Sequence, residues 1–203
     1  MSIALKGTQM KRNMTPAEID ERTARYAELE KMNVPIDRDL VSQDAMDVIF
    51  ARNILPIIME KTKNPFGDTG AIYGANGMTM NISVLPPEQG PCLHAHNGTF
   101  ETFIVLEGEI TFHVGEPGQE EHLTLGKWDV FSCPPEAYRG FNNASGENQA
   151  VLLTVINGDP TARDDVNVPP GITNHLRDTF GEEVLQEFKN VVNLPETEAE
   201  TEA

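Results

Sequence analysis

The stretch "GPCLHAHNGTFETFIVLEG", residues 90–108, combines the alternation of a β-strand with two closely spaced histidines and a glutamate. His94 and His96 are separated by one residue, and side chains alternate between the two faces of a strand, so both imidazoles are expected on the same face. Glu101 is five residues after His96, so in one continuous strand its side chain would lie on the opposite face. The intervening Asn97-Gly98 can reset this phase, because both residues tolerate the backbone conformations of turns. The pattern therefore predicts that Glu101 points inward together with the two histidines.

The residues after this break continue the alternation. Downstream of the break we expect Glu101, Phe103 and Val105 on the inner face, and Thr102, Ile104 and Leu106 on the outer face. Glu107-Gly108 is expected to turn the chain into the next strand, "EITFHVG".

The two imidazoles and the carboxylate are a potential metal-ligand set. Three such donors on one side of an ion leave open positions on the other side, an arrangement that non-haem Fe(II) favours, with Mn, Ni, Co or Zn also possible. His94, His96 and Glu101 are therefore the predicted ligands of a divalent transition metal. The alternative for the histidines is a pair of hydrogen-bonded polar side chains at the mouth of a barrel.

The sequence around this stretch indicates a mainly β protein. Residues 71–158 consist of short runs with period-two alternation, separated by Gly, Pro and Asn, which is typical of an antiparallel sandwich or barrel. Helical patterns lie on both sides of it. Thr15, Pro16 and Glu18 predict the start of a helix over 15–32, and residues 183–194 have one broad apolar face. Pro56 makes one continuous helix over 46–66 unlikely, so the structure of that run is left open.

The predicted organisation has four parts. Residues 1–69 are an N-terminal extension with the helix and an arm, and residues 70–158 are a β-barrel. Residues 159–194 are a C-terminal helical segment, and residues 195–203 are a disordered acidic tail.

Two segments resemble the motifs of the cupin superfamily. The first motif is matched by Gly90, His94, His96, Glu101 and Gly108. The second resembles "GKWDVFSCPPEAYRGFNN", with Asp129, Pro134 and Asn143 at its expected positions. The resemblance spans residues 90–143 and implies a single cupin jelly-roll β-barrel, of the conserved-barrel type, with N-terminal and C-terminal helical extensions. It implies the range of functions found in cupins, namely metal-dependent dioxygenases, decarboxylases, lyases, isomerases and non-catalytic binders.

The sequence departs from the second cupin motif at Arg139, where the family usually has a third histidine. A guanidinium has no free lone pair and cannot bind a metal. One role for Arg139 is a bidentate clamp on a substrate carboxylate. The alternatives are a surface cation, or an ion pair with Glu101 that replaces the metal. Water, substrate or Tyr138 could fill the vacant position, and Tyr138 could also act as an acid, base or hydrogen-bond donor to substrate.

The other histidines and the cysteines are not assigned to the site. His113 and His122 are expected at the surface or at a strand edge, although His113 is a reserve ligand if its side chain faces inward. His175 is expected to be structural. Cys92 and Cys133 are expected to be buried, inert thiols outside any disulfide framework.

Composition limits the partners. The 203 residues carry a formal net charge of −17, which disfavours nucleic acid and anionic membranes as partners. The absence of a long apolar run or a signal-peptide core predicts a cytoplasmic protein.

We expect a homodimer in which the N-terminal helix forms an arm. The favoured function is a dioxygenase-like oxidoreductase acting on a small carboxylate or carbonyl compound. The alternatives are a metal-dependent lyase or isomerase, and a non-catalytic binder of a small ligand.

Overall fold

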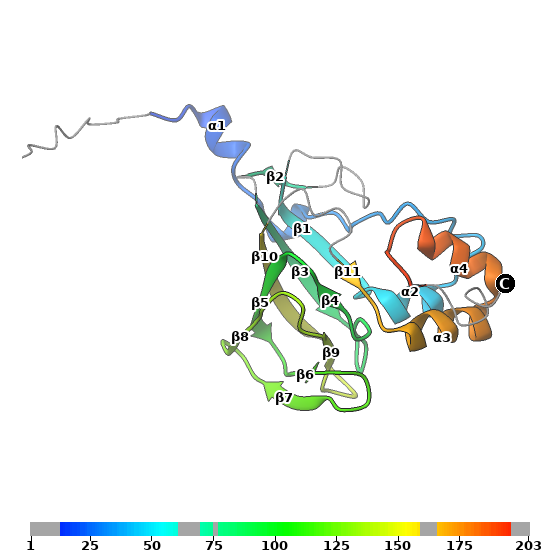
Figure 1. Ribbon diagram of the computed structural model, residues 1–203. Coiled ribbons are helices and arrows are strands. Elements are labelled where there is room, and N and C mark those ends of the chain that lie inside the picture. The colour runs from blue at the N-terminus through cyan, green and yellow to red at the C-terminus, as the bar shows by residue number, and fades with distance from the viewer. Residues whose placement is uncertain (1–12, 61–69, 75–76, 159–165, 196–203) are drawn as a thin grey trace, which may run out of the picture.

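The central part of the protein is built from two facing β-sheets. The computed structural model describes residues 13–60, 70–74, 77–158 and 166–195 (Figure 1). A six-stranded sheet has the order β2-β1-β3-β10-β5-β8, and a three-stranded sheet has the order β7-β6-β9. Every neighbouring pair is antiparallel except β1 and β2, which are parallel. The predicted jelly-roll fold is therefore confirmed, although the two sheets do not close into one continuous barrel.

The strands of the large sheet are β1 (Asn53–Met59), β2 (Ile72–Tyr73), β3 (Met78–Leu85), β5 (Thr99–Glu107), β8 (Val130–Cys133) and β10 (Ala150–Gly158). Those of the small sheet are β6 (Ile110–Val114), β7 (Glu121–Leu125) and β9 (Arg139–Asn143). A separate two-stranded pairing joins β4 (Ala95–His96) to β11 (Val166–Asn167), with His96 opposite Val166.

The core between the sheets is aromatic. Phe103, Phe112 and Phe141 are each at most 5% exposed, and their ring centroids lie 5.1 to 5.8 Å apart. Burial alternates along β5 as the sequence predicts, with Glu101, Phe103 and Val105 buried and the residues between them more exposed. Gly108 has φ +76° and forms the predicted turn into β6. The Glu101 carboxylate consequently faces the space between the sheets.

A second apolar core lies beside the sheets. Its helices are α2 (Gln43–Ile49), α3 (Pro170–Phe180) and α4 (Glu182–Lys189), which pack together on one side of the molecule (Figure 1). Gly181, at φ +95°, ends α3 and allows α4 to begin at once. The predicted C-terminal helix is thus shorter than 183–194, although Val192 and Leu194 still pack in this core. The predicted tail lies almost entirely outside the described residues.

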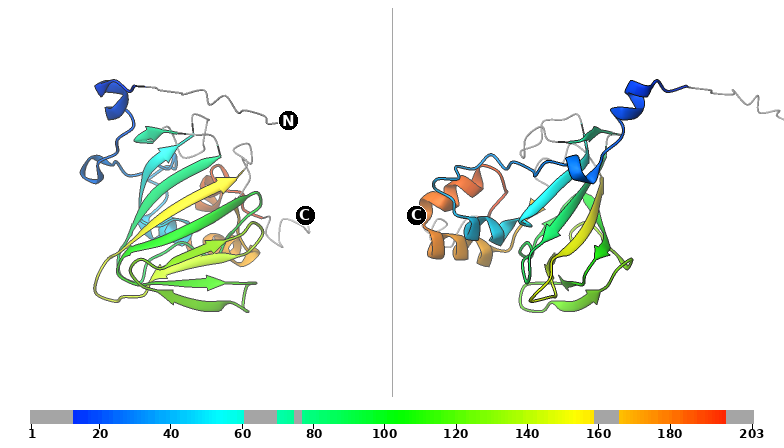
Figure 2. Two further views of the ribbon diagram at one scale, coloured as in Figure 1. Left: turned by 90° about the vertical axis from the view of Figure 1, so that its left-hand side faces the viewer. Right: turned by 180° about the vertical axis from the view of Figure 1, so that it is seen from behind.

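The N-terminal helix is shorter than the sequence predicts. Thr15 and Glu18 form the expected capping box, but α1 covers only Pro16–Asp20, followed by the single turn η1 at Tyr26–Glu28. Ile19 and Tyr26 are 53% and 58% exposed, so this segment lacks the packing that stabilises most helices. The helix α1 stands away from the sheets in both views of Figure 2. Its role as an arm in a homodimer stays a prediction.

The sheet also begins earlier than the predicted boundary at residue 70. The apolar run over 46–66 contains the end of α2 and the whole of β1. Pro56 lies in β1, where the pairing with β3 shifts register between Pro56 and Ile58, because proline cannot donate to the ladder. Among the described residues, no helix is both long and apolar enough to span a membrane.

Candidate metal centre

Three side chains converge at the start of β5. His94 forms a β-bridge with Arg139, His96 lies in β4, and a bend at Asn97–Gly98 separates β4 from Glu101 in β5. The ligand atoms of His94, His96 and Glu101 all lie within 4.8 Å of one another. The Nε2 atoms of His94 and His96 are 3.9 and 3.6 Å from Oε2 of Glu101. The predicted convergence of the three side chains is therefore observed.

The hydrogen bond of His94 defines its ligand atom. Nδ1 of His94 lies 2.8 Å from the carbonyl oxygen of Cys92, which can only accept. Nδ1 therefore carries the proton, and Nε2, the atom that faces Glu101, carries the lone pair. Metal-binding histidines commonly use their second ring nitrogen in this way. The sequence did not indicate that Cys92 orients His94, because the contact is made by the main-chain carbonyl and not by the thiol.

Arg139 is held against Glu101. Nε and Nη2 of Arg139 both donate to Oε2 of Glu101, at 2.9 and 2.7 Å, and Nη1 is 3.4 Å from the carbonyl oxygen of Ala137. The Arg139 side chain is 0% exposed and that of Glu101 is 8% exposed. The ion pair between them, one of the alternatives for Arg139, is thus present. The alternative of a surface cation is wrong, because β9 directs this side chain inward.

The role of Arg139 as a substrate clamp stays a prediction. Its Nε and Nη2 donors are directed at Oε2 of Glu101. In this geometry Arg139 fixes the position of the carboxylate. Buried ionised groups need such partners because the cost of removing them from water is several kcal/mol per ion.

Tyr138 is not part of the group formed by the two histidines and Glu101. Its carbonyl oxygen accepts from the backbone N–H of Gly115, and the side chain of the following Arg139 points inward. Alternation places the Tyr138 side chain on the opposite face. Its role toward a bound substrate stays a prediction.

The spacing of the three donors suits a divalent ion. Two ligands bound to one ion at about 2.1 Å lie roughly 3 to 4 Å apart, depending on the bond angle. The observed separations of 3.6 and 3.9 Å between nitrogen and carboxylate oxygen fall in this range. These two separations are compatible with one ion bound to Glu101 and to both imidazoles.

The remaining sequence candidates lie outside this group. Ile110 and Phe112 point into the core from β6, so His113 faces outward and is not a reserve ligand. His175 is exposed on α3. Cys133 is opposite Glu101 in the pairing of β5 with β8 and is buried, and Cys92 is partly buried against the helical core.

Both thiols are expected to be unreactive. Burial raises the pKa of Cys92 to about 12, and burial together with the negative charge of Glu101 raises the pKa of Cys133 to about 11. At pH 8 the thiolate fraction of either residue is then at least about a hundredfold below that of an ordinary cysteine. We expect the folded protein to react with a thiol reagent slower by that factor than the protein in denaturant. Equal rates in the two states would contradict this assignment.

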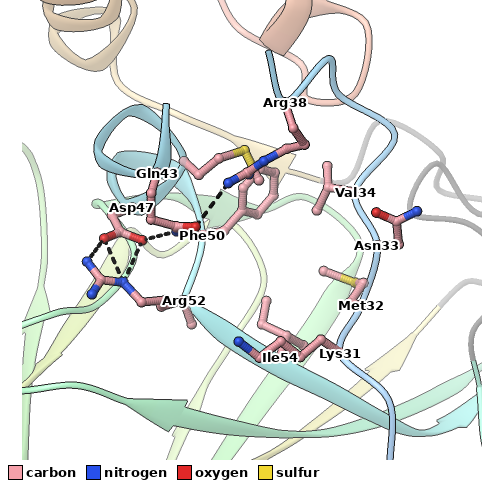
Figure 3. A pocket seen from close by; sticks show the side chains of 12 residues that line it. Lys31, Met32, Asn33, Val34, Arg38, Gln43, Asp47, Phe50, Arg52 and Ile54 are labelled. Atoms are coloured by element: carbon pink, nitrogen blue, oxygen red, sulfur yellow. Dashed lines mark hydrogen bonds and ion pairs between the residues drawn. The ribbon is translucent and has the colours of Figure 1, made fainter. Parts of the chain in front are cut away.

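A pocket of about 290 Å³ lies apart from the three ligands (Figure 3). It lies between the segment before α2, the helix α2 and the start of β1. Asp47 pairs with Arg52, and Arg38 donates to Gln43, so much of its polar lining is engaged within the wall. None of the histidines lines it. This pocket has no convergent set of metal ligands.

Comparison with known proteins finds a family match within the sheet region. A family model described as Cupin domain matches residues 81–156. No curated protein matches the sequence of the chain.

Several solved structures are similar to part of the chain. One is the crystal structure of FeII HppE, at 18% identity and a TM-score of 0.37, over 39% of this chain and 43% of that one. A protein from Thermus thermophilus is 29% identical at a TM-score of 0.38, over 44% of this chain and 80% of that one. A predicted oxalate decarboxylase from Thermotoga maritima is 26% identical at a TM-score of 0.36, over 39% of this chain and 65% of that one. The chain therefore spans less than half of HppE.

Proposed function

Because residues 81–156 form a cupin domain, we propose that this protein is a metal-dependent cupin enzyme that acts on a small carboxylate or carbonyl compound. The observation that carries this proposal is the group of His94, His96 and Glu101, with ligand atoms within 4.8 Å of one another. Two nitrogen donors and one carboxylate suit Fe(II) first, with Mn, Ni, Co or Zn as alternatives. Bound there, Fe(II) would supply dioxygen chemistry, and the other ions Lewis-acid chemistry.

The protein's own contribution is to hold the three ligands in place. The carbonyl oxygen of Cys92 fixes the ring of His94, with Nε2 toward Glu101. Arg139 fixes the carboxylate of Glu101 and keeps a positive charge beside it. The pairing of β4 with β11 holds the backbone at His96. Since Arg139 is directed at Glu101, we propose that substrate oxygen atoms bind at the positions that the three ligands leave open.

The Arg139–Glu101 pair also favours a second candidate. Two charge-assisted hydrogen bonds to Oε2 withdraw electron density from the carboxylate and make it a weaker donor to the metal. A weaker donor set is compatible with a non-catalytic binder of a small ligand. It is also compatible with a lyase or isomerase, in which the ion does not change its oxidation state.

Oxygen consumption separates these functions. Protein loaded with Fe(II) is tested against a panel of small carboxylates, diketones, thiols and aromatic diols, with His96→Ala as the control that lacks a ligand. We expect oxygen uptake that depends on both the substrate and His96. Product formation without oxygen uptake, under Zn or Mn, would support a lyase or isomerase. Binding of a panel compound without turnover under any metal would contradict the enzyme proposal and support the binder.

A further inference from the structure

A pair of histidines lies on the outer face of the small sheet, away from the candidate metal centre. His113 in β6 is directly opposite His122 in β7. Their Nδ1 atoms are 2.8 Å apart, and the ring centroids are 4.8 Å apart at an interplanar angle of 84°. Residues directly opposite in an antiparallel pair hold their side chains side by side, so the strand register itself brings the two imidazoles together.

A chain of hydrogen bonds determines which ring nitrogen of His113 carries a proton. Nδ2 of Asn142 donates to the carbonyl oxygen of Asn143 at 3.0 Å, which fixes the orientation of the Asn142 amide. The amide oxygen Oδ1 therefore faces Nε2 of His113, at 2.6 Å. Because this oxygen can only accept, Nε2 carries the proton. In the neutral ring, the lone pair is then on Nδ1, the atom that faces His122.

This arrangement has the features of a metal site with its supporting residue. A ligating histidine usually donates its other ring N–H to an oxygen atom, which orients the ring. Two imidazole nitrogens bound side by side to one ion at about 2.1 Å are roughly 3 Å apart, close to the separation seen here. We propose that His113 and His122 form a second divalent-cation site, for ions of the Zn²⁺, Ni²⁺ and Cu²⁺ class, with Asn142 as its positioning residue.

The local charge favours a cation at this place. Two acidic residues, Glu120 and Glu121, directly precede His122 in the sequence, so negative charge lies close to the pair along the chain. His122 is exposed, so water can reach the ion and complete its coordination. In the metal-free protein the same distance corresponds to a hydrogen bond from Nδ1 of His122 to Nδ1 of His113. On metal binding, the proton on Nδ1 of His122 moves to Nε2 of the same ring.

Zinc binding to the full-length protein tests this proposal. We expect the native protein to bind one more Zn²⁺ per chain than His122→Gln, which changes an exposed side chain outside the core. Asn142→Leu should retain the site but bind zinc about 10- to 100-fold more weakly, because the ring of His113 is no longer oriented. His175→Gln, at an exposed histidine on α3, is the matched control and should bind as the native protein does. Equal zinc uptake by the native protein and His122→Gln would overturn the proposal.

A second measurement does not depend on any variant. In a zinc titration of the native protein followed by ring ¹H–¹⁵N NMR, the resonances of His113 and His122 should change together, while that of His175 stays in place. If neither ring responds at saturating zinc, the pair is only a hydrogen bond and the proposal is wrong.

Discussion

His96→Ala is expected to lose its metal ion, whereas the native protein is expected to hold about one per chain. His96 supplies one of only two imidazoles in the group, and its Nε2 is 3.6 Å from the Glu101 carboxylate. Without it, the group keeps a single imidazole and a carboxylate oxygen that already accepts two hydrogen bonds from Arg139, so we expect the ion to be lost during purification. The measurement is metal analysis of the purified protein by mass spectrometry. It is made in a His122→Gln background, so that the outer histidine pair does not contribute.

His175→Ala is the matched control, because it removes an imidazole that lies outside both groups of ligands. It should retain the full metal content. Thermal unfolding gives a second readout, since an ion that binds only the native state raises the melting temperature. Equal metal content in His96→Ala and the control would refute the ligand assignment, and equal melting temperatures with and without metal would count against it.

Arg139→Leu is expected to lower the free energy of unfolding of the metal-free protein by about 3–5 kcal/mol. The substitution leaves the Glu101 carboxylate buried without its charged partner, as the two hydrogen bonds from Arg139 to Oε2 are lost. Replacing both residues, in Glu101→Leu/Arg139→Leu, should recover much of this loss, because no buried charge is then left unpaired. Urea denaturation of the native protein and these variants measures the effect.

The same variant tests whether Glu101 is a metal ligand. A divalent ion bound to the carboxylate would replace the positive charge of Arg139, so added metal should restore stability to Arg139→Leu but not to the double variant. If metal has no effect on Arg139→Leu, the ion pair substitutes for a metal at this site. If Arg139→Leu is as stable as the native protein, the pair does not hold the carboxylate.

The sequence predicted the inward-facing ligands because strand parity is a local property. Two histidines at alternate positions and a break of two residues were enough to place His94, His96 and Glu101 on one face. The partner of Arg139 could not be decided in this way, since Glu101 is 38 residues away along the chain. Its contact depends on how β9 faces β5. The sequence therefore left the clamp and the ion pair as alternatives.

Other differences have similar causes. The capping box at Thr15 is local and was predicted correctly, but the length of the helix depended on packing that residues 15–32 do not make. The proximity of His113 and His122 depends on the register of β6 and β7, which the spacing of nine residues does not specify. The carbonyl oxygen that orients His94 belongs to the main chain, and no side-chain type signals it.

The pairing of β4 with β11 connects the strand that carries His96 to the segment that leads into the helical core. Val166 lies opposite His96, and the chain passes from β11 directly into α3 and the second apolar core. Separately packed regions of a protein open with their own free energies. We therefore expect an ion bound at His96 to leave faster in a variant with a weakened helical core, because opening of that core would also release β11 from β4.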